Sequence, residues 1–329
     1  MTMFRHNCTK TAIILLFAFC VRSDAQTPPL NVTPPTVSTE GTNHSIWYIS
    51  TRHLPLDPQQ NTKGGELYYY RLTKNKWQPS SSQDYSADAR PTCLIVHGSP
   101  ATSDLVSSAS LEVYSHLATQ ISDESSVRFA IWSWPAHRRV SGLVNEFKDQ
   151  AIRAEQQSRY LAQFIDATRN QSPTAVVGYS MGGRVTLGAL ELLAGGTPPH
   201  QTQYKPSSKR EKPFKLMLLV SAVGHGCLQK DAEYSRALTQ TDECLVIYNN
   251  KDPLLKRYRK LYDTKRDDRH YAIGHTGAQD PTEIRRTGAQ YRQLDVTATI
   301  GSHHDIRAYT RNKTVLRQIM DHSLMSIIK

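Results

Sequence analysis

The stretch Val176-Val177-Gly178-Tyr179-Ser180-Met181-Gly182-Gly183-Arg184 decides the fold. It contains the pattern G-x-S-x-G between an apolar run typical of a buried strand and a run with helical periodicity. In a nucleophile elbow the serine occupies a sharp strand-to-helix turn, where small neighbours such as Gly178 and Gly182 allow the chain segments to approach closely. The pattern therefore predicts Ser180 as a nucleophile; the alternative is a glycine-rich turn with an incidental serine.

On both sides of this turn, short β-rich segments alternate with longer helical patterns. We predict eight strands, at residues 45–50, 66–72, 92–96, 127–133, 174–179, 214–221, 244–249 and 294–300. We predict helices near residues 107–120, 145–169, 182–194, 229–239, 253–262 and 312–327. The first two strands are candidates for antiparallel pairing, and the later helices are long enough for crossovers between parallel strands. The expected fold is α/β, the α/β-hydrolase fold, with a mostly parallel eight-stranded sheet covered by helices on both faces.

The N-terminal region has the pattern of a secretory signal peptide. Basic residues precede an unbroken apolar run, Ala12–Val21, which is shorter than the roughly 20 residues that span a bilayer. Small residues, Ser23 and Ala25, stand before the expected cleavage site. We therefore expect residues 1–25 to be removed and the protein to be exported, either to a periplasm or into the medium.

The rest of the chain is predicted to form one domain behind a tether. Residues 26–44 are rich in Pro, Thr and Ser and have no apolar period, which predicts a flexible tether. Residues 45–329 are expected to form the α/β-hydrolase domain. Two polar segments, 195–213 and 263–292, interrupt the alternation and are expected to be surface excursions.

The cysteines do not form a disulfide framework. Removal of residues 1–25 leaves Cys93, Cys227 and Cys244, an odd number. Cys93 lies in an apolar strand and reads as a small buried hydrophobe. The sequence alone allows a disulfide between Cys227 and Cys244 and does not decide whether it forms.

The chain is basic, with 40 Lys and Arg against 29 Asp and Glu and a formal net charge of +11. Residues 1–25 hold three basic side chains and one acidic one, so the remainder carries +9. Such a balance favours contact with an anionic surface or substrate, and it equally serves solubility. The charges are scattered and not interleaved with aromatic residues, so no nucleic-acid partner is predicted.

Two backbone N–H groups are candidates for binding an oxyanion. The helix after Ser180 directs its first amides toward the site, which makes the Met181 N–H one donor. The turn after strand 92–96 reads His97-Gly98-Ser99-Pro100, and the Ser99 N–H is the candidate second donor because proline has none. His97 precedes the serine in the chain, and we assign it a structural role.

The acid of the triad is expected after a strand that follows Ser180, because this fold orders its triad as serine, acid, histidine. The turn after strand 244–249 supplies Asp252, whereas the turn after strand 214–221 contains no carboxylate. Asp252 also precedes a predicted helix and could serve as its N-cap. The two roles are compatible.

The base is expected after the last strand, where the chain reads Gly301-Ser302-His303-His304-Asp305. We favour His304, which is one residue nearer to the entrance of the last helix, and keep His303 as the alternative base. Either histidine could instead be an exposed loop side chain or a metal ligand. The other ligands of a zinc site are missing at suitable spacing, so neither a metal nor a cofactor is predicted.

Further motifs accompany the elbow: Ile49-Ser50-Thr51-Arg52-His53-Leu54-Pro55, His97-Gly98, Ile131-Trp132-Ser133-Trp134-Pro135 and Tyr248-Asn249-Asn250-Lys251-Asp252-Pro253-Leu254-Leu255-Lys256-Arg257-Tyr258. From about Ile46 onward, the chain resembles an uncharacterised bacterial group of α/β-hydrolases and a broader hydrolase family with a domain of unknown function. The resemblance implies a triad of Ser180, Asp252 and His304, and it implies no substrate.

The motifs together favour a serine hydrolase that acts on a small-molecule carboxylic ester or related acyl compound through an acyl-enzyme. An acyltransferase or an amidase would use the same residues and differ in the acceptor or the leaving group. A catalytically silent protein of this fold that binds a ligand is the alternative outside enzymes.

Overall fold

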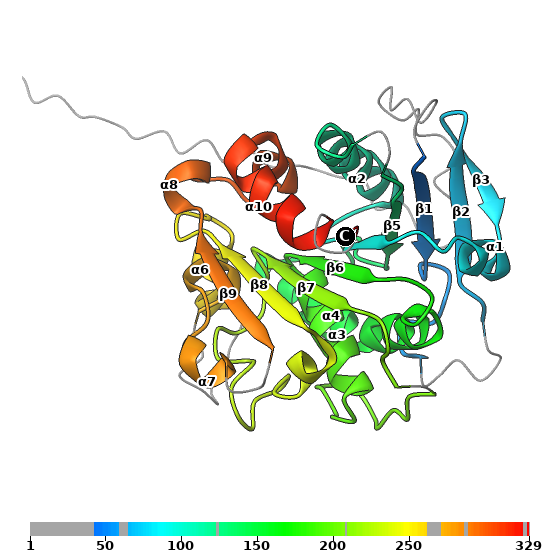
Figure 1. Ribbon diagram of the computed structural model, residues 1–329. Coiled ribbons are helices and arrows are strands. Elements are labelled where there is room, and N and C mark those ends of the chain that lie inside the picture. Colours follow the sequence, from blue (N-terminus) through cyan, green and yellow to red (C-terminus); the bar gives the residue numbers. More distant parts are fainter. Residues whose placement is uncertain are drawn as a thin grey trace, which may run out of the picture.

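The computed structural model describes residues 43–58, 65–122, 125–207, 209–261, 271–285, 289–324 and 328 (Figure 1). The signal peptide predicted for residues 1–25 and residues 26–42 of the predicted tether lie outside these ranges. No helix within the described ranges is both long enough and apolar enough to cross a membrane.

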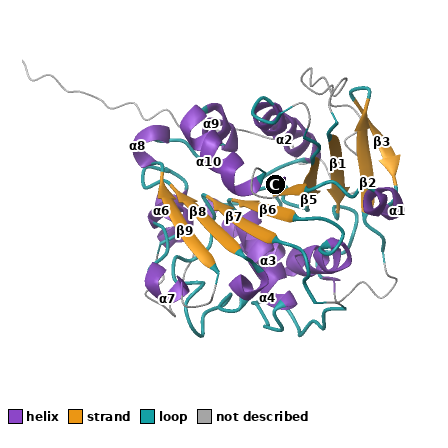
Figure 2. Ribbon diagram, viewed as in Figure 1, coloured by secondary structure: helices purple, strands orange, loops and turns teal. Residues whose placement is uncertain are grey.

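The described residues form an α/β structure around one nine-stranded sheet, in the order β3-β2-β1-β5-β4-β6-β7-β8-β9 (Figure 2). Strands β1, β2 and β3 pair antiparallel, and every other pairing is parallel. The bounds are β1 Ser45–Ser50, β2 Tyr68–Thr73, β3 Lys76–Ser80, β4 Thr92–Val96, β5 Arg128–Ser133, β6 Thr174–Tyr179, β7 Phe214–Leu219, β8 Glu243–Tyr248 and β9 Gln290–Asp295. The predicted mostly parallel α/β architecture is confirmed, and the predicted count of eight strands is wrong.

The ninth strand is β3, at the edge of the sheet. Its sequence, Lys76-Trp77-Gln78-Pro79-Ser80, contains a proline, which cannot donate to a central ladder and is tolerated on an edge. Of its five residues only Trp77 is buried. The segment therefore lacks both the alternation and the apolar content that identified the other strands.

Helices cover both faces of the sheet (Figure 1). Helices α2, α9 and α10 pack together, as do α3 and α4. The bounds are α1 Ser82–Ala87, α2 Ser103–Ala118, α3 Leu143–Thr168, α4 Gly182–Leu193, α5 Tyr258–Leu261, α6 Ile273–Thr276, α7 Pro281–Arg285, α8 Thr297–Ile300, α9 Ile306–Arg311 and α10 Lys313–Ser323, with 3₁₀ turns η2 Ala237–Gln240 and η3 Leu255–Arg257. Strands β4, β5 and β7 are buried along their whole length, as expected for parallel strands covered on both sides.

Turns and short helices take the place of two predicted helices. The helix predicted at 229–239 is a series of turns that ends in η2, and the one predicted at 253–262 is η3 followed by α5. The segment 263–292, predicted as a surface excursion, contains α6, α7 and the start of β9 where it is described.

The last strand lies earlier in the sequence than predicted. Residues 297–300 are β-branched or small and were expected to be extended, yet they form α8. The Asp295 carboxylate accepts a hydrogen bond from the Thr297 N–H at 2.8 Å, and the Ile300 N–H donates to the Val296 carbonyl at 2.8 Å. A local hydrogen bond of the Asp295 side chain therefore accompanies the end of β9 and the start of a helical turn, in spite of the β propensity of this segment.

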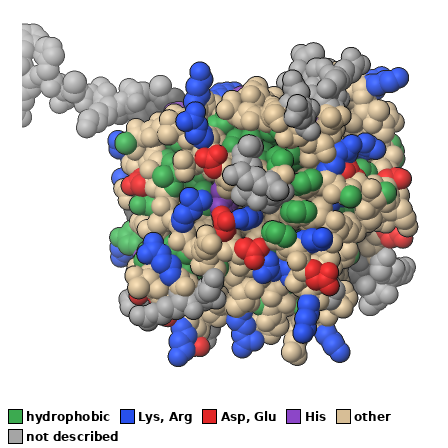
Figure 3. All heavy atoms as spheres, in the orientation of Figure 1, with side chains coloured by type: hydrophobic (Ala, Val, Ile, Leu, Met, Phe, Trp, Pro, Cys, Tyr) green, Lys and Arg blue, Asp and Glu red, His purple; other side chains and the backbone are tan. Residues whose placement is uncertain are grey.

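Cys93 and Cys244 are free and buried, so the bridge between Cys227 and Cys244 that the sequence left open is not formed. Burial raises the pKa of the Cys93 thiol to about 12 and raises that of Cys244 further. Charged side chains are mixed in sign across the face shown in Figure 3, where Lys and Arg are interspersed with Asp and Glu.

Candidate active site

The turn from β6 into α4 holds Ser180 in a left-handed backbone conformation, with φ of 52°. A residue with a side chain adopts this conformation at a cost of about 1–2 kcal/mol, so neighbouring bonds must hold it. The Ser180 N–H donates to the Leu219 carbonyl at 3.1 Å, and the Ser180 carbonyl accepts from the Ala222 N–H at 3.0 Å. Both partners belong to the end of β7 and the turn after it, so the neighbouring strand fixes the elbow.

The glycines of the elbow are required by close packing. A Cβ atom at Gly182 would lie 2.1 Å from the Val96 carbonyl oxygen, and one at Gly183 would lie 2.3 Å from the Ser221 hydroxyl oxygen. Contacts this short do not occur in folded proteins, and in the first case the obstacle is backbone. Any side chain at Gly182 would therefore push α4 away from β4.

Three of the predicted residues meet at the carboxyl edge of the sheet. His304 Nε2 lies 2.9 Å from the Ser180 hydroxyl oxygen, and His304 Nδ1 lies 2.6 Å from Asp252 Oδ2. Ser180 and Asp252 are 1% and 0% exposed, whereas the His304 side chain is 18% exposed. An ionised carboxylate only accepts hydrogen bonds, so the imidazole proton sits on Nδ1 and Nε2 accepts from the serine hydroxyl.

Asp252 has a second set of partners. Its Oδ1 accepts hydrogen bonds from the Leu254 N–H at 2.9 Å and the Leu255 N–H at 3.0 Å. These two bonds fix the carboxylate plane at the start of η3 and leave Oδ2 for His304. The capping role and the contact with the histidine therefore coexist in one side chain, as the sequence allowed.

His303, the alternative base, is exposed, and its side chain makes no hydrogen bond within the described residues. Its backbone carbonyl, in contrast, accepts from Asn249 Nδ2 at 3.2 Å and from the Tyr309 hydroxyl at 3.0 Å. These backbone contacts orient the loop so that His304, and not His303, faces the serine.

The two candidate oxyanion donors have free N–H groups. Neither the Met181 N–H nor the Ser99 N–H donates a hydrogen bond to any part of the chain that the structure describes. Met181 directly follows Ser180 at the start of α4. Ser99 follows Gly98, where a Cβ atom would lie 2.8 Å from the Cβ of Ser180. Its hydroxyl donates to Gln150 Oε1, which holds the loop to α3.

His97 has the contacts of a structural residue. Its Nδ1 lies 2.6 Å from the Gly98 carbonyl, and its Nε2 accepts from the Trp134 N–H at 3.2 Å. Burial, with a contribution from the charge of Arg52, lowers the pKa of His97 to about 3. The ring is therefore neutral and ties the turn after β4 to the turn after β5.

Sequence reasoning missed Asn249, which links the loops of the acid and the base. It is fully buried at the end of β8, and its Nδ2 donates to the Gly301 carbonyl at 2.8 Å as well as to the His303 carbonyl. Tyr309 stands 3.1 Å from the same nitrogen. The Asn249 Oδ1 accepts a hydrogen bond from the Lys251 N–H at 3.0 Å. An Asn at the end of a buried strand, three residues before the acid, is the signal that could have identified it.

Tyr179, the residue before the serine, is a second missed contact. Its hydroxyl donates to the His304 carbonyl at 2.7 Å, and the two rings lie 5.5 Å apart. Burial raises the pKa of Tyr179 well above its ordinary value, so it stays a neutral donor. The carbonyls of residues 301, 303 and 304 are thus all held by side chains from β6, from α9 and from the residue that follows β8.

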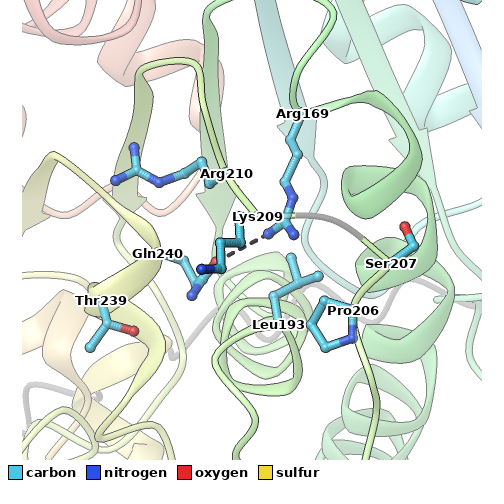
Figure 4. Close-up of a pocket in the computed structure, with 8 residues that line it drawn as sticks. All are labelled: Arg169, Leu193, Pro206, Ser207, Lys209, Arg210, Thr239 and Gln240. Atoms are coloured by element: carbon cyan, nitrogen blue, oxygen red, sulfur yellow. Dashed lines mark hydrogen bonds between the residues drawn. The ribbon is translucent and has the colours of Figure 1, made fainter.

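A separate pocket of about 500 Å³ lies at the amino edge of the sheet (Figure 4). It is lined by Arg169, Leu193, Pro206, Ser207, Lys209, Arg210, Thr239 and Gln240. In Figure 4 the Arg169 and Gln240 side chains point toward one another, and they form a 3.2 Å hydrogen bond. Arg169 also pairs with Asp166 at 3.0 Å, and Arg210 pairs with Asp242 at 2.8 Å.

The chain matches no protein-family model, and a search of curated proteins also finds no match. Within the described residues, no group of three or more His, Cys, Asp or Glu side chains is arranged to hold a metal ion.

Proposed function

We propose that the protein is an exported serine hydrolase of the α/β-hydrolase fold that cleaves a carboxylic ester or a related acyl compound. One observation carries the proposal: a continuous hydrogen-bond chain runs from the Ser180 hydroxyl through both nitrogens of His304 to Asp252. The mostly parallel sheet, with the strained serine after a central strand, supports the same fold.

The first step follows from the tautomer of His304. Because Asp252 accepts the Nδ1 proton, Nε2 has a free lone pair aimed at the Ser180 hydroxyl. As the serine oxygen attacks the substrate carbonyl, the hydroxyl proton moves to Nε2, and the buried carboxylate stabilises the imidazolium. His304 then returns the proton to the leaving alcohol, which gives the acyl-enzyme.

The second step uses water and the same base. His304 takes a proton from water, the hydroxide attacks the acyl carbon, and the proton passes back to Ser180. The His304 side chain is the partly exposed member of the three, at 18%, so water approaches the site from its side. In both steps negative charge develops on the former carbonyl oxygen, and the free N–H groups of Met181 and Ser99 are the donors available to it.

The proposal is tested by labelling the purified protein with a fluorophosphonate, which reacts only with an activated serine. We expect stoichiometric labelling at Ser180, complete loss in Ser180→Ala, and unchanged labelling in Ser302→Ala, a matched control on an exposed loop serine. Hydrolysis of p-nitrophenyl esters should follow the same pattern. A folded wild-type protein that neither reacts with the probe nor turns over esters would contradict the proposal and favour a ligand-binding role.

A further inference from the structure

Exposed apolar side chains concentrate beside the candidate active site. The large hydrophobic side chains that are exposed among the described residues are Tyr68, Leu105, Val140, Leu143, Val144, Ile152 and Tyr271. Three of them, Val140, Leu143 and Val144, belong to the loop after β5 and the first turn of α3 and are 37%, 51% and 41% exposed. Solvent exposure of three aliphatic side chains within five residues is costly unless another surface covers them.

Other exposed hydrophobic side chains lie along the carboxyl edge of the sheet, where Ser180 is. Leu105 is in the first turn of α2, which follows β4, and Tyr68 pairs with Ser50 at the carboxyl end of β1. The carbonyl of Tyr271 accepts a hydrogen bond from His225, in the turn after β7. The carboxyl edge that brings together Ser180, Asp252 and His304 is therefore also the apolar edge of the described structure.

The segment 138–145, which we call the β5–α3 rim, is ordered and attached to the site. All its residues are exposed, and the first carboxylate after it, Glu146, is buried. Glu146 Oε2 accepts from the backbone N–H groups of Arg139 and Val140 at 3.0 and 2.9 Å. Its Oε1 accepts from Gln150, which in turn accepts from the Ser99 hydroxyl beside the nucleophile. The start of the rim is thus attached to the residues that hold the candidate oxyanion loop.

The charge of the rim has one sign. Arg138 and Arg139 precede Val140, and residues 138–145 contain no acidic side chain. Neither guanidinium group makes an ion pair or a hydrogen bond with the described residues. Free arginines next to exposed aliphatic side chains are the composition that binds an anionic lipid–water interface, where the apolar groups enter the acyl region and the cations contact the headgroups.

We propose that the β5–α3 rim docks the protein on an anionic lipid surface, so that the acyl substrate is taken from that surface. The docking stands on the rim alone, and the statement about the substrate rests on the proposed function. The statement about the substrate assigns to the site a lipophilic acyl ester held in a lipid layer.

The docking is tested by flotation of the purified protein with phosphatidylglycerol vesicles and with phosphatidylcholine vesicles. All variants carry the same N-terminus, so lipid affinity of that region is common to them. The variant Val140→Ser/Leu143→Ser/Val144→Ser should lose roughly tenfold or more in affinity for the anionic vesicles. Arg138→Gln/Arg139→Gln should lose about 25-fold for phosphatidylglycerol and about twofold or less for phosphatidylcholine, because each arginine contributes about fivefold near an anionic surface.

Ile152→Ser is the matched control, because Ile152 is equally exposed on the same helix, two turns beyond the rim, and should change binding by less than about twofold. Absence of binding by the wild type, unchanged binding of the triple serine variant, or an equal loss in Ile152→Ser would overturn the docking.

The statement about the substrate has its own readout. The triple serine variant should hydrolyse a long-chain p-nitrophenyl ester embedded in anionic vesicles at least tenfold more slowly than the wild type, roughly in line with its lost affinity. It should hydrolyse soluble p-nitrophenyl acetate and react with the fluorophosphonate at wild-type rates. Equal rates on the embedded ester would overturn this statement. A wild type that binds vesicles yet fails to react with the fluorophosphonate would disprove the hydrolase proposal and leave the docking intact.

Discussion

The two edges of the sheet hold different kinds of polar site. At the amino edge, a pocket of about 500 Å³ is lined by Arg169, Lys209 and Arg210, and both arginines are already paired with carboxylates. At the carboxyl edge, Ser180 is nearly inaccessible, at 1% exposure, yet it is hydrogen-bonded to an imidazole that is oriented by a carboxylate. The amino-edge pocket therefore has paired arginines, and the carboxyl edge has a serine, a histidine and an aspartate in one hydrogen-bonded arrangement.

The difference teaches that unsatisfied groups identify a chemical site better than open volume does. The arginines of the amino edge have fixed partners, which is typical of ion pairs that tie loops to a sheet. At the carboxyl edge, the backbone N–H groups of Ser99 and Met181 have no acceptor among the described residues, and the serine backbone is strained. Groups left unpaired and strained in a folded protein are expected where a ligand or a transition state completes them.

The largest expected effect separates the two adjacent histidines. His304→Ala should reduce kcat/KM for a p-nitrophenyl ester by about 10⁵-fold or more, because it removes the base that activates the serine. His303→Ala should stay within about twofold of the wild type, because its side chain is exposed and makes no hydrogen bond within the described structure. Steady-state kinetics on both variants decide the matter. Comparable losses in the two would mean that the loop exchanges its histidines during turnover.

A smaller effect should come from Asn249, which joins the loops of the proposed acid and base. Asn249→Leu keeps the side-chain volume and removes the donor to the Gly301 and His303 carbonyls. A displacement of His304 by about 1 Å would lower kcat about 10²-fold with little change in KM. Tyr309→Phe, which removes one of the same contacts, should give a milder loss.

Thermal unfolding of both variants, measured beside the kinetics, distinguishes positioning from folding. A lower melting temperature with an unchanged kcat at 25 °C would show that Asn249 only stabilises the fold.

The sequence was sufficient for features that are encoded locally. The elbow and the turn with Asp252 were predictable because a central parallel strand is continuously apolar and its turn residues follow directly. Strand β3 was not, because Pro79 and the polar residues of an edge strand give no period. The end of β9 was misplaced because residues 297–300 form a helical turn in spite of their β propensity, with the Thr297 N–H donating to the Asp295 carboxylate and the Ile300 N–H to the Val296 carbonyl.

The structure places His304, and not His303, within hydrogen-bond distance of Ser180 and Asp252, and sequence position alone could not establish this placement. Which of the two adjacent histidines faces the serine depends on the carbonyl contacts of Asn249, Tyr309 and Tyr179. Those contacts come from β6, from α9 and from the residue after β8, and no local pattern encodes them.

One buried histidine at each edge of the sheet should make the free energy of unfolding depend on pH. Burial lowers the pKa of His97 to about 3 and that of His322, at the amino edge, to about 4. In the unfolded chain both titrate near 6.5, so between pH 6.5 and about 4 the unfolded state binds more protons than the folded one. The free energy of unfolding should therefore fall as pH falls through this window, by up to about 1.4 kcal/mol per pH unit for each histidine.

Urea unfolding at pH 7, 6 and 5 measures this slope. His322→Gln keeps a donor for the Leu216 carbonyl, which His322 Nε2 contacts at 2.8 Å, and should remove about half of the pH dependence. A wild type whose stability does not change over this range would mean that the histidines are protonated in the folded state.

The smallest effect is expected at the amino-edge pocket, and it decides whether the contrast between the edges holds. Arg210 pairs with Asp242 through side chains that are 24% and 41% exposed, so Arg210→Gln should cost only about 0.5 kcal/mol of stability. Ester turnover should stay within about twofold, because no described contact joins this pocket to Ser180. Phosphate should raise the melting temperature of wild type and variant equally. If phosphate protected the wild type alone, Arg210 would bind anions in spite of its ion pair, and satisfied charges would no longer distinguish the structural edge from the chemical one.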